Sequence, residues 1–192
     1  MGIARSDMPP DPMTKSPSSN AFAVWITGLP ASGKSTIVAA LLPKLEELGL
    51  RVEVLESDDV RRFITPSPTY SQEERDQFYR ALVFIGARLV AHGVSVIFDA
   101  TANKRAYREA ARSLIPLFLE VAAECPLDVC MARDRKGTYR KGQEGGTSTV
   151  PGLQTPYEPP LAPDLRIETT RTSPESGAQQ IVALIRQRLG LR

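Results

Sequence analysis

The sequence has 192 residues, of which 42% are hydrophobic, and its formal net charge is +2. This length predicts one domain with a sizeable hydrophobic core, and a charge so close to neutral gives no indication of a nucleic-acid-binding protein. Every apolar run is well short of the roughly 18 residues that a membrane span needs. Two cysteines are too few for a disulfide framework, so we expect a reducing, cytoplasmic location.

Residues 1–20 are rich in proline and serine and contain little that could be buried. This composition predicts a disordered leader, followed by a folded domain over residues 21–192. Beyond the leader, short apolar runs alternate with stretches of helical periodicity. We expect strands over residues 21–27, 51–56, 94–99, 117–123 and 164–170. We expect helices over residues 34–50, 71–93, 104–116, 126–134 and 173–189.

Continuous apolar strands that alternate with helices predict an α/β fold, in which helices cover both faces of a five-stranded parallel sheet. In such sheets ligands bind beyond the carboxyl ends of the strands. Three local signals mark helix starts: Ser71 with Glu74 has the spacing of a capping box, Ser173 is a predicted N-cap, and Pro126 is expected at a first helical position.

The segment GLPASGKST, residues 28–36, follows the first predicted strand and fits G-x-x-x-x-G-K-[ST] at every position. Its glycines let the backbone bend, so that successive N–H groups face phosphate oxygens. Lys34 is expected to reach the β- and γ-phosphates of ATP, and the Ser35 hydroxyl to coordinate Mg²⁺. The motif predicts a P-loop NTPase fold, a three-layer sandwich, with ATP contacts from Gly28, Leu29, Pro30, Ala31, Ser32, Gly33, Lys34, Ser35 and Thr36.

Acidic and basic residues follow the second predicted strand in ESDDVRR, residues 56–62. Asp58 or Asp59 is expected beside the phosphate-binding loop, where a carboxylate can deprotonate an acceptor hydroxyl or hold a water on Mg²⁺. Capping of a helix start is the alternative role, and Asp59 fits it. Arg61 and Arg62, one turn further on, are placed to hold an anionic group of the acceptor.

Residues 134–163 are basic at first and then rich in glycine, threonine and proline, which predicts a mobile lid. Phosphoryl transfer requires positive charge on the equatorial oxygens and exclusion of water, and a cationic lid supplies both. A solvated charged surface is the alternative interpretation. The cations concerned are Arg133, Arg135, Lys136, Arg140 and Lys141.

Together these segments resemble the adenylylsulfate kinase (APS kinase) family, small P-loop enzymes that phosphorylate the 3′-hydroxyl of adenosine 5′-phosphosulfate. The resemblance covers about residues 20–190 and rests on GLPASGKST, LESDDVRR and PLDVCMARDRKGTYRKG followed by TPYEPP. It implies a kinase of sulfate assimilation with ATP and Mg²⁺ as cofactors and a small nucleotide as substrate. It leaves the oligomeric state open, with a homodimer as one option.

The resemblance also implies roles for individual residues. Asp58 matches the catalytic aspartate, and with Ser35 it is a candidate for the metal site. Arg133 and Arg140 are implied contacts of ATP. The implied substrate contacts are Arg61, Tyr70, Arg75, Thr101, Ala102, Asn103, Arg105, Lys136 and Lys141.

Three positions on the acceptor side depart from the family pattern: Phe78 replaces an asparagine, Ala102 a serine and Val150 an aromatic residue. They leave open a kinase for another hydroxyl, such as a polynucleotide end or a small metabolite, or a nucleotide-binding regulatory protein without turnover. The segment that begins at Asp99 resembles the D-x-T-x-x-x-R stretch of another branch of P-loop kinases. That likeness implies that Asp99 holds Mg²⁺ through water, and that Asn103 and Arg105 face the acceptor.

Overall fold

The computed structural model describes residues 20–145 and 149–191, so the predicted leader lies outside the described residues except for Asn20. A five-stranded sheet forms the centre of the fold, in the order β2-β3-β1-β4-β5. All four strand pairs are parallel, which confirms the predicted sheet. The strands are β1 (Ala23–Thr27), β2 (Val52–Glu56), β3 (Ser95–Asp99), β4 (Phe118–Glu124) and β5 (Leu165–Glu168).

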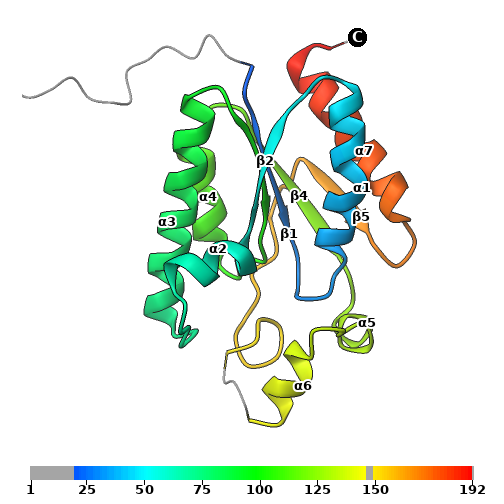
Figure 1. Ribbon diagram of the computed structural model, residues 1–192. Coiled ribbons are helices and arrows are strands. Elements are labelled where there is room, and N and C mark those ends of the chain that lie inside the picture. The colour runs from blue at the N-terminus through cyan, green and yellow to red at the C-terminus, as the bar shows by residue number, and fades with distance from the viewer. Residues whose placement is uncertain (1–19, 146–148, 192) are drawn as a thin grey trace, which may run out of the picture.

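Helices cover both faces of this sheet (Figure 1). The long helix α3 (Gln72–Ala91) packs with α4 (Arg105–Leu114) on one face, and α1 (Lys34–Glu47) packs with α7 (Pro174–Leu189) on the other. Successive side chains of β1 point to opposite faces, so Trp25 enters the core beneath α3 while Ile26 enters the core beneath α1 and α7. Burial on both faces explains the continuous apolar runs of the central strands β1 and β3, whereas the edge strands β2 and β5 contain charged residues and are only partly buried.

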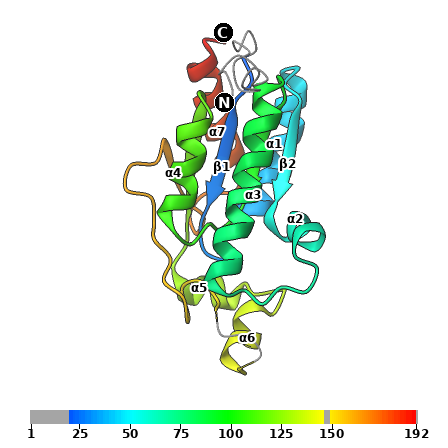
Figure 2. The same ribbon diagram turned by 90° about the vertical axis from the view of Figure 1, so that its left-hand side faces the viewer.

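Three short helices lie at the carboxyl ends of the strands: α2 (Ser57–Ile64), α5 (Leu127–Ala132) and α6 (Thr138–Gln143) (Figures 1 and 2). The helix α6 lies within the segment that we expected to be a mobile lid. Its start is fixed by Asp134, whose carboxylate accepts hydrogen bonds from the backbone N–H groups of Thr138 at 2.8 Å and Tyr139 at 2.7 Å. The cap comes from a residue that lies before the helix, and α6 was not among the helices that we expected from the sequence.

The predicted helix starts are confirmed only in part. Ser173 and Ser71 each accept a hydrogen bond from a backbone N–H three residues later, at 3.2 Å. The reciprocal half of the capping box is wrong, because the Glu74 carboxylate turns instead to Thr69, Tyr70 and Arg61. Pro126 is an N-cap and not the first helical residue. Over the described part of the chain, every helix is too short or too polar to cross a membrane.

Candidate active site

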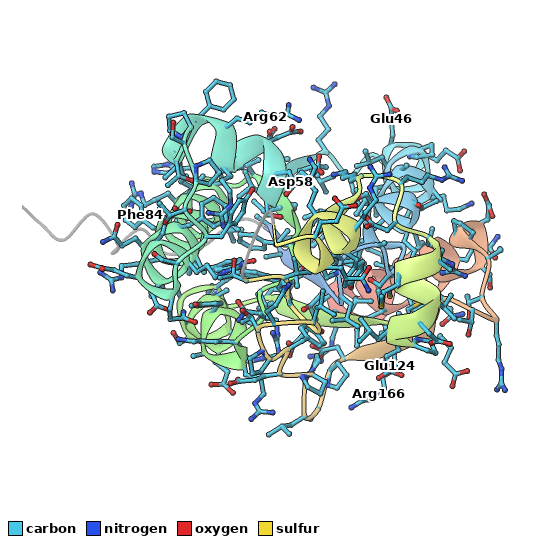
Figure 3. The ribbon with its side chains drawn as sticks, turned by 90° about the horizontal axis from the view of Figure 1, so that it is seen from below. Glu46, Asp58, Arg62, Phe84, Glu124 and Arg166 are labelled. Carbon is cyan, nitrogen blue, oxygen red and sulfur yellow. The ribbon has the colours of Figure 1, made fainter. Side chains whose placement is uncertain are left out.

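A cavity of about 920 Å³ opens at the carboxyl ends of the strands, as the sheet topology predicts. Seen along the strands from this end, Asp58 lies near the middle of the molecule between α2 and α6, whereas Arg62 and Phe84 lie toward the rim (Figure 3). The loop after β1 forms one side of the cavity. Residues of α2 and of the start of α3 form the other side, and the lid segment contributes residues 133–136 and 149–151.

The loop after β1 brings its backbone close to β4. A Cβ atom on Gly28 would come within 2.4 Å of the Ala123 carbonyl oxygen, so only glycine fits at this position. Gly33, which opens α1, has a left-handed φ of 99°. Such a path points successive N–H groups toward one space, which suits a polyphosphate.

The side chain of Lys34 is folded over this loop. Its ammonium group donates hydrogen bonds to the carbonyl oxygens of Gly28 at 3.1 Å and Leu29 at 2.8 Å. Burial lowers the pKa of Lys34, while the nearby Asp99 carboxylate opposes that shift. The loop residues that line the cavity are Pro30, Ala31, Gly33, Lys34, Ser35 and Thr36. Gly28, Leu29 and Ser32 lie behind this lining.

Asp99 ends β3 next to the loop and is almost fully buried at the cavity wall. Burial raises the pKa of its carboxyl group, and both the positive charge of Lys34 and a hydrogen bond from the Ser35 side chain act against this. A hydroxyl and a carboxylate side by side are the oxygen ligands, direct or through water, that Mg²⁺ prefers beside phosphates. The donor set at Ser35 and Asp99 therefore fits Mg²⁺.

Asp58 faces the cavity from α2 and contacts the lid. The Lys136 ammonium group donates a hydrogen bond to Asp58 Oδ2 at 2.7 Å and lies 3.4 Å from Glu56 Oε1. The hydrogen bond to Asp58 raises the pKa of Lys136. Asp59 instead pairs with Arg62 at 2.9 Å. Of the two candidate carboxylates, the structure brings only Asp58 into the cavity lining.

Two arginines flank an aromatic ring on the other side of the cavity. The guanidinium carbon of Arg61 lies 5.2 Å from the centre of the Tyr70 ring, and that of Arg75 lies 5.6 Å from it. Arg75 is held by the Tyr70 carbonyl at 3.1 Å and by the Thr149 carbonyl at 2.6 Å. All four residues line the cavity. Thr149 carries no sequence signal that would have predicted its part in this cluster.

Glu74 supports this cluster from outside the cavity lining. Its carboxylate pairs with Arg61 at 2.8 Å and also accepts hydrogen bonds from the Thr69 hydroxyl at 2.7 Å and from the Tyr70 N–H at 3.2 Å. Burial alone would raise the pKa of Glu74, but these hydrogen bonds and the charge of Arg61 outweigh it, so that the pKa is lowered. The ionised carboxylate thus links α2 to the loop before α3, a role that the sequence interpretation missed.

The segment after β3 corrects part of the predicted acceptor site. Thr101 lines the cavity, but Ala102, Asn103 and Arg105 do not. The chain at residues 156–159 packs against this segment: the Asn103 side-chain amide donates a hydrogen bond to the Pro156 carbonyl at 3.4 Å, and Arg105 Nη1 donates to the Pro159 carbonyl at 3.4 Å. Asn103 and Arg105 therefore do not face the cavity, contrary to expectation.

Of the predicted lid cations, Arg133, Arg135, Lys136 and Lys141 line the cavity. Arg133 approaches β5, where it donates hydrogen bonds to the Thr169 carbonyl at 3.2 Å and the Thr169 hydroxyl at 3.4 Å. Arg140 is exposed and does not line the cavity, and its guanidinium group lies close to Gly137. Arg140 therefore lies outside the candidate nucleotide site, contrary to expectation.

Comparison with known protein families settles the resemblance. A family model described as adenylylsulphate kinase matches residues 20–168. The chain belongs to the adenylylsulphate kinase family. It is 41% identical over 151 residues to a probable adenylyl-sulfate kinase of Archaeoglobus fulgidus, which covers 79% of this chain and 97% of that protein. It is 39% identical over 168 residues to an adenylyl-sulfate kinase of Chloroflexus aurantiacus, which covers 87% of this chain and 90% of the relative.

Solved structures of this family share the fold. The APS kinase CysC of Mycobacterium tuberculosis, solved in complex with AMPPNP and APS, is 32% identical with a TM-score of 0.81, over 87% of this chain and 98% of the other. A hexameric APS kinase from Thiobacillus denitrificans is 27% identical with a TM-score of 0.68. That match covers 94% of this chain and 31% of the longer chain. The predicted P-loop fold is thereby confirmed.

Proposed function

We propose that this protein is an ATP-dependent kinase that transfers the γ-phosphoryl group to the 3′-hydroxyl of adenosine 5′-phosphosulfate (APS). The observation that carries the proposal is a single cavity in which a phosphate-binding loop faces a pair of arginines, with Asp58 between them. Membership of the adenylylsulphate kinase family supports APS as the acceptor, and the neighbour solved with AMPPNP and APS supports ATP as the donor.

The loop side of the cavity suits the triphosphate. Backbone N–H groups between Gly28 and Ser35 and the start of α1 supply fixed positive dipoles. Lys34 adds a charge that is already desolvated, and such a charge stabilises the oxygens of the transferred group more strongly than a hydrated one. In our proposal this ammonium group leaves the Gly28 and Leu29 carbonyls and turns to the phosphates.

We propose Mg²⁺ as the metal cofactor, held by the Ser35 hydroxyl and, through water, by Asp99. When bound, the ion supplies positive charge to the phosphate oxygens. The raised pKa of Asp99 reflects a buried carboxylate short of positive partners, which a divalent cation would provide. The protein's part is to keep both oxygen ligands beside Lys34.

Asp58 is the group that we assign to the acceptor hydroxyl, as the base that orients it and takes its proton. In the structure this carboxylate is occupied by Lys136, so Lys136 has to release it when the substrates bind. A lysine that moves from a carboxylate to a phosphoryl group remains paired with negative charge throughout. The lid thus brings a cation to the place where charge develops during transfer.

The arginine side of the cavity suits an anionic nucleotide. Arg61 and Arg75 present two positive charges close to a planar ring, Tyr70, on which a base can stack. The phosphosulfate group of APS is anionic and its adenine is planar, so both parts of the acceptor find a counterpart here. A neutral sugar would leave these two charges without a partner.

A coupled assay of ADP release tests this function. We expect addition of APS to stimulate ADP release strongly, while adenosine 5′-monophosphate, gluconate and a 5′-hydroxyl oligonucleotide leave the rate at its basal level. The Asp58→Asn variant controls for a contaminating kinase. If the oligonucleotide or gluconate stimulated ADP release as strongly as APS, APS would not be the specific acceptor. ATP binding without stimulation by any acceptor would support a regulatory protein instead.

A further inference from the structure

The guanidinium group of Arg61 lies over the ring of an aromatic side chain, Phe78. Its central carbon is 3.7 Å from the centre of the Phe78 ring, which is fully buried. Arg61 itself is only 6% exposed. We propose that Phe78 is a positioning residue that fixes the plane of the Arg61 guanidinium and so sets the affinity for the anionic acceptor. This inference rests on the function proposed above.

Two contacts from α3 define the orientation of Arg61. Glu74 and Phe78 are four residues apart on this helix, so they lie on the same face of it. Glu74 holds Arg61 Nη1 at 2.8 Å, which fixes one edge of the guanidinium. The Phe78 ring supports its face. An edge contact and a face contact together remove the rotation that a single ion pair would allow.

The Phe78 ring stabilises the positive charge of Arg61 without neutralising it. Burial of a cation costs solvation free energy that another interaction must offset. A second carboxylate could offset it, but it would neutralise Arg61 and accept hydrogen bonds from its N–H groups. An aromatic face attracts the cation through its quadrupole and forms no hydrogen bond with the N–H groups. Glu74 is the one described residue to which Arg61 donates a side-chain hydrogen bond, so N–H groups remain for a ligand in the cavity.

The Glu74 charge is also shared. The oxygen that does not contact Arg61 accepts from Thr69 and Tyr70. The loop that Glu74 thereby holds places Tyr70 at a left-handed φ of 54°, with its ring 5.2 Å from Arg61. A carboxylate divided between a loop and a cation neutralises the cation less completely than a dedicated partner does. The site therefore keeps positive charge for the acceptor, and the Phe78 ring holds that charge in place.

The alternative is that Phe78 only fills the core, since it also packs edge-on against Tyr79 at 5.3 Å. Phe78→Leu distinguishes the two roles, because leucine keeps an apolar side chain at this position and removes the aromatic face. We expect the KM for APS to rise about 3- to 30-fold, the range that corresponds to a desolvated cation–π contact. We expect kcat and the KM for ATP to stay within about twofold of the wild-type values, since Phe78 is not among the cavity-lining residues, which include the phosphate-binding loop and Asp58.

A double-mutant cycle with Arg61→Met makes the test specific. If Phe78 acts through Arg61, Phe78→Leu has no further effect on the KM for APS in the Arg61→Met background. Phe84→Leu is the matched control, because Phe84 is on the same helix but 61% exposed and points away from the cavity (Figure 3). It is expected to match the wild type. Thermal melting of each variant checks that it is folded under the assay conditions.

The outcomes separate this inference from the proposed function. A wild-type enzyme that ignores APS contradicts both. A wild type that turns over APS, together with a folded Phe78→Leu variant whose KM for APS is unchanged, contradicts the positioning role alone. The same holds if Phe78→Leu raises the KM for APS equally with and without Arg61, or raises the KM for ATP in parallel. Only a selective, Arg61-dependent rise supports the proposal.

Discussion

The two sides of the cavity are built in different ways. The loop side is made from backbone, because Gly28 has no room for a Cβ atom and Lys34 bonds to loop carbonyls. The arginine side is made from side chains held by contacts with other residues. Arg61 packs on Phe78, and Arg75 donates a hydrogen bond to the carbonyl of Thr149 in the lid segment. Backbone geometry tolerates few sequences, whereas stacked side chains can be exchanged if charge and orientation are kept. Phe78, one of the three positions that depart from the family pattern, contacts Arg61 on the arginine side.

Asp58 is where the two sides meet, and its removal has the largest expected effect. We predict that Asp58→Asn lowers kcat about 10²–10⁴-fold, the usual contribution of a general base, with little change in either KM. The adjacent Asp59→Asn is the matched control, because Asp59 pairs with Arg62 and does not line the cavity. Steady-state kinetics of both variants decide the matter. A near-normal rate for Asp58→Asn would remove this residue from the role of base.

Lys34 tests the loop side alone. We predict that Lys34→Met lowers kcat about 10²–10³-fold, the loss typical of one preorganised donor in a desolvated site. The dissociation constant for APS, measured by calorimetry, should be unchanged because, among the described residues, the Lys34 ammonium group donates hydrogen bonds to its own loop alone. A weakened affinity for APS would show that the two sides are not independent.

Arg75 is the corresponding test of the arginine side. We predict that Arg75→Met raises the KM for APS about 10- to 100-fold, as expected when a charged hydrogen-bond donor is lost. The KM for ATP should stay near its wild-type value. Arg80→Met, an exposed position on the same helix, serves as control. A parallel rise in both KM values would mean that Arg75 holds the lid, through Thr149, and not the acceptor.

The fold and the loop side could be predicted from sequence because their signals are local. Apolar strands that alternate with helices identified the parallel sheet, and nine consecutive residues identified the phosphate-binding loop. The arginine side could not be predicted in the same way. Glu74 fits a capping box by spacing, yet its carboxylate is used by Arg61, thirteen residues earlier in the chain.

The placement of Asn103 and Arg105 depended on contacts that are still more distant. Residues 156–159 lie about fifty positions further along the chain and accept hydrogen bonds from these two side chains, which lie outside the cavity lining. Contacts of this kind leave no periodic pattern in the sequence. The sequence therefore indicates that a residue is polar or charged, but not which residue it contacts.

The smallest predicted effect concerns the proposed metal site and pH. Burial raises the pKa of Asp99, so its carboxylate becomes protonated at a higher pH than an ordinary aspartate. Protonation removes the charge that attracts the metal, so affinity for Mg²⁺ should weaken as the pH falls through that raised pKa. Titration of the enzyme–ATP complex with Mg²⁺ at pH 7.5 and 5.5 should show a few-fold weakening beyond that of Asp99→Asn. Equal pH dependence in both proteins would exclude Asp99 from the metal site.

The central claim is that one cavity joins a donor on its loop side to an acceptor on its arginine side. Incubation of the enzyme with ATP labelled at the γ-phosphate, Mg²⁺ and APS, followed by separation of the products, tests it directly. We expect the label to appear in a doubly phosphorylated adenine nucleotide, in equal amount to the ADP formed. Label in inorganic phosphate, with unchanged APS, would contradict it.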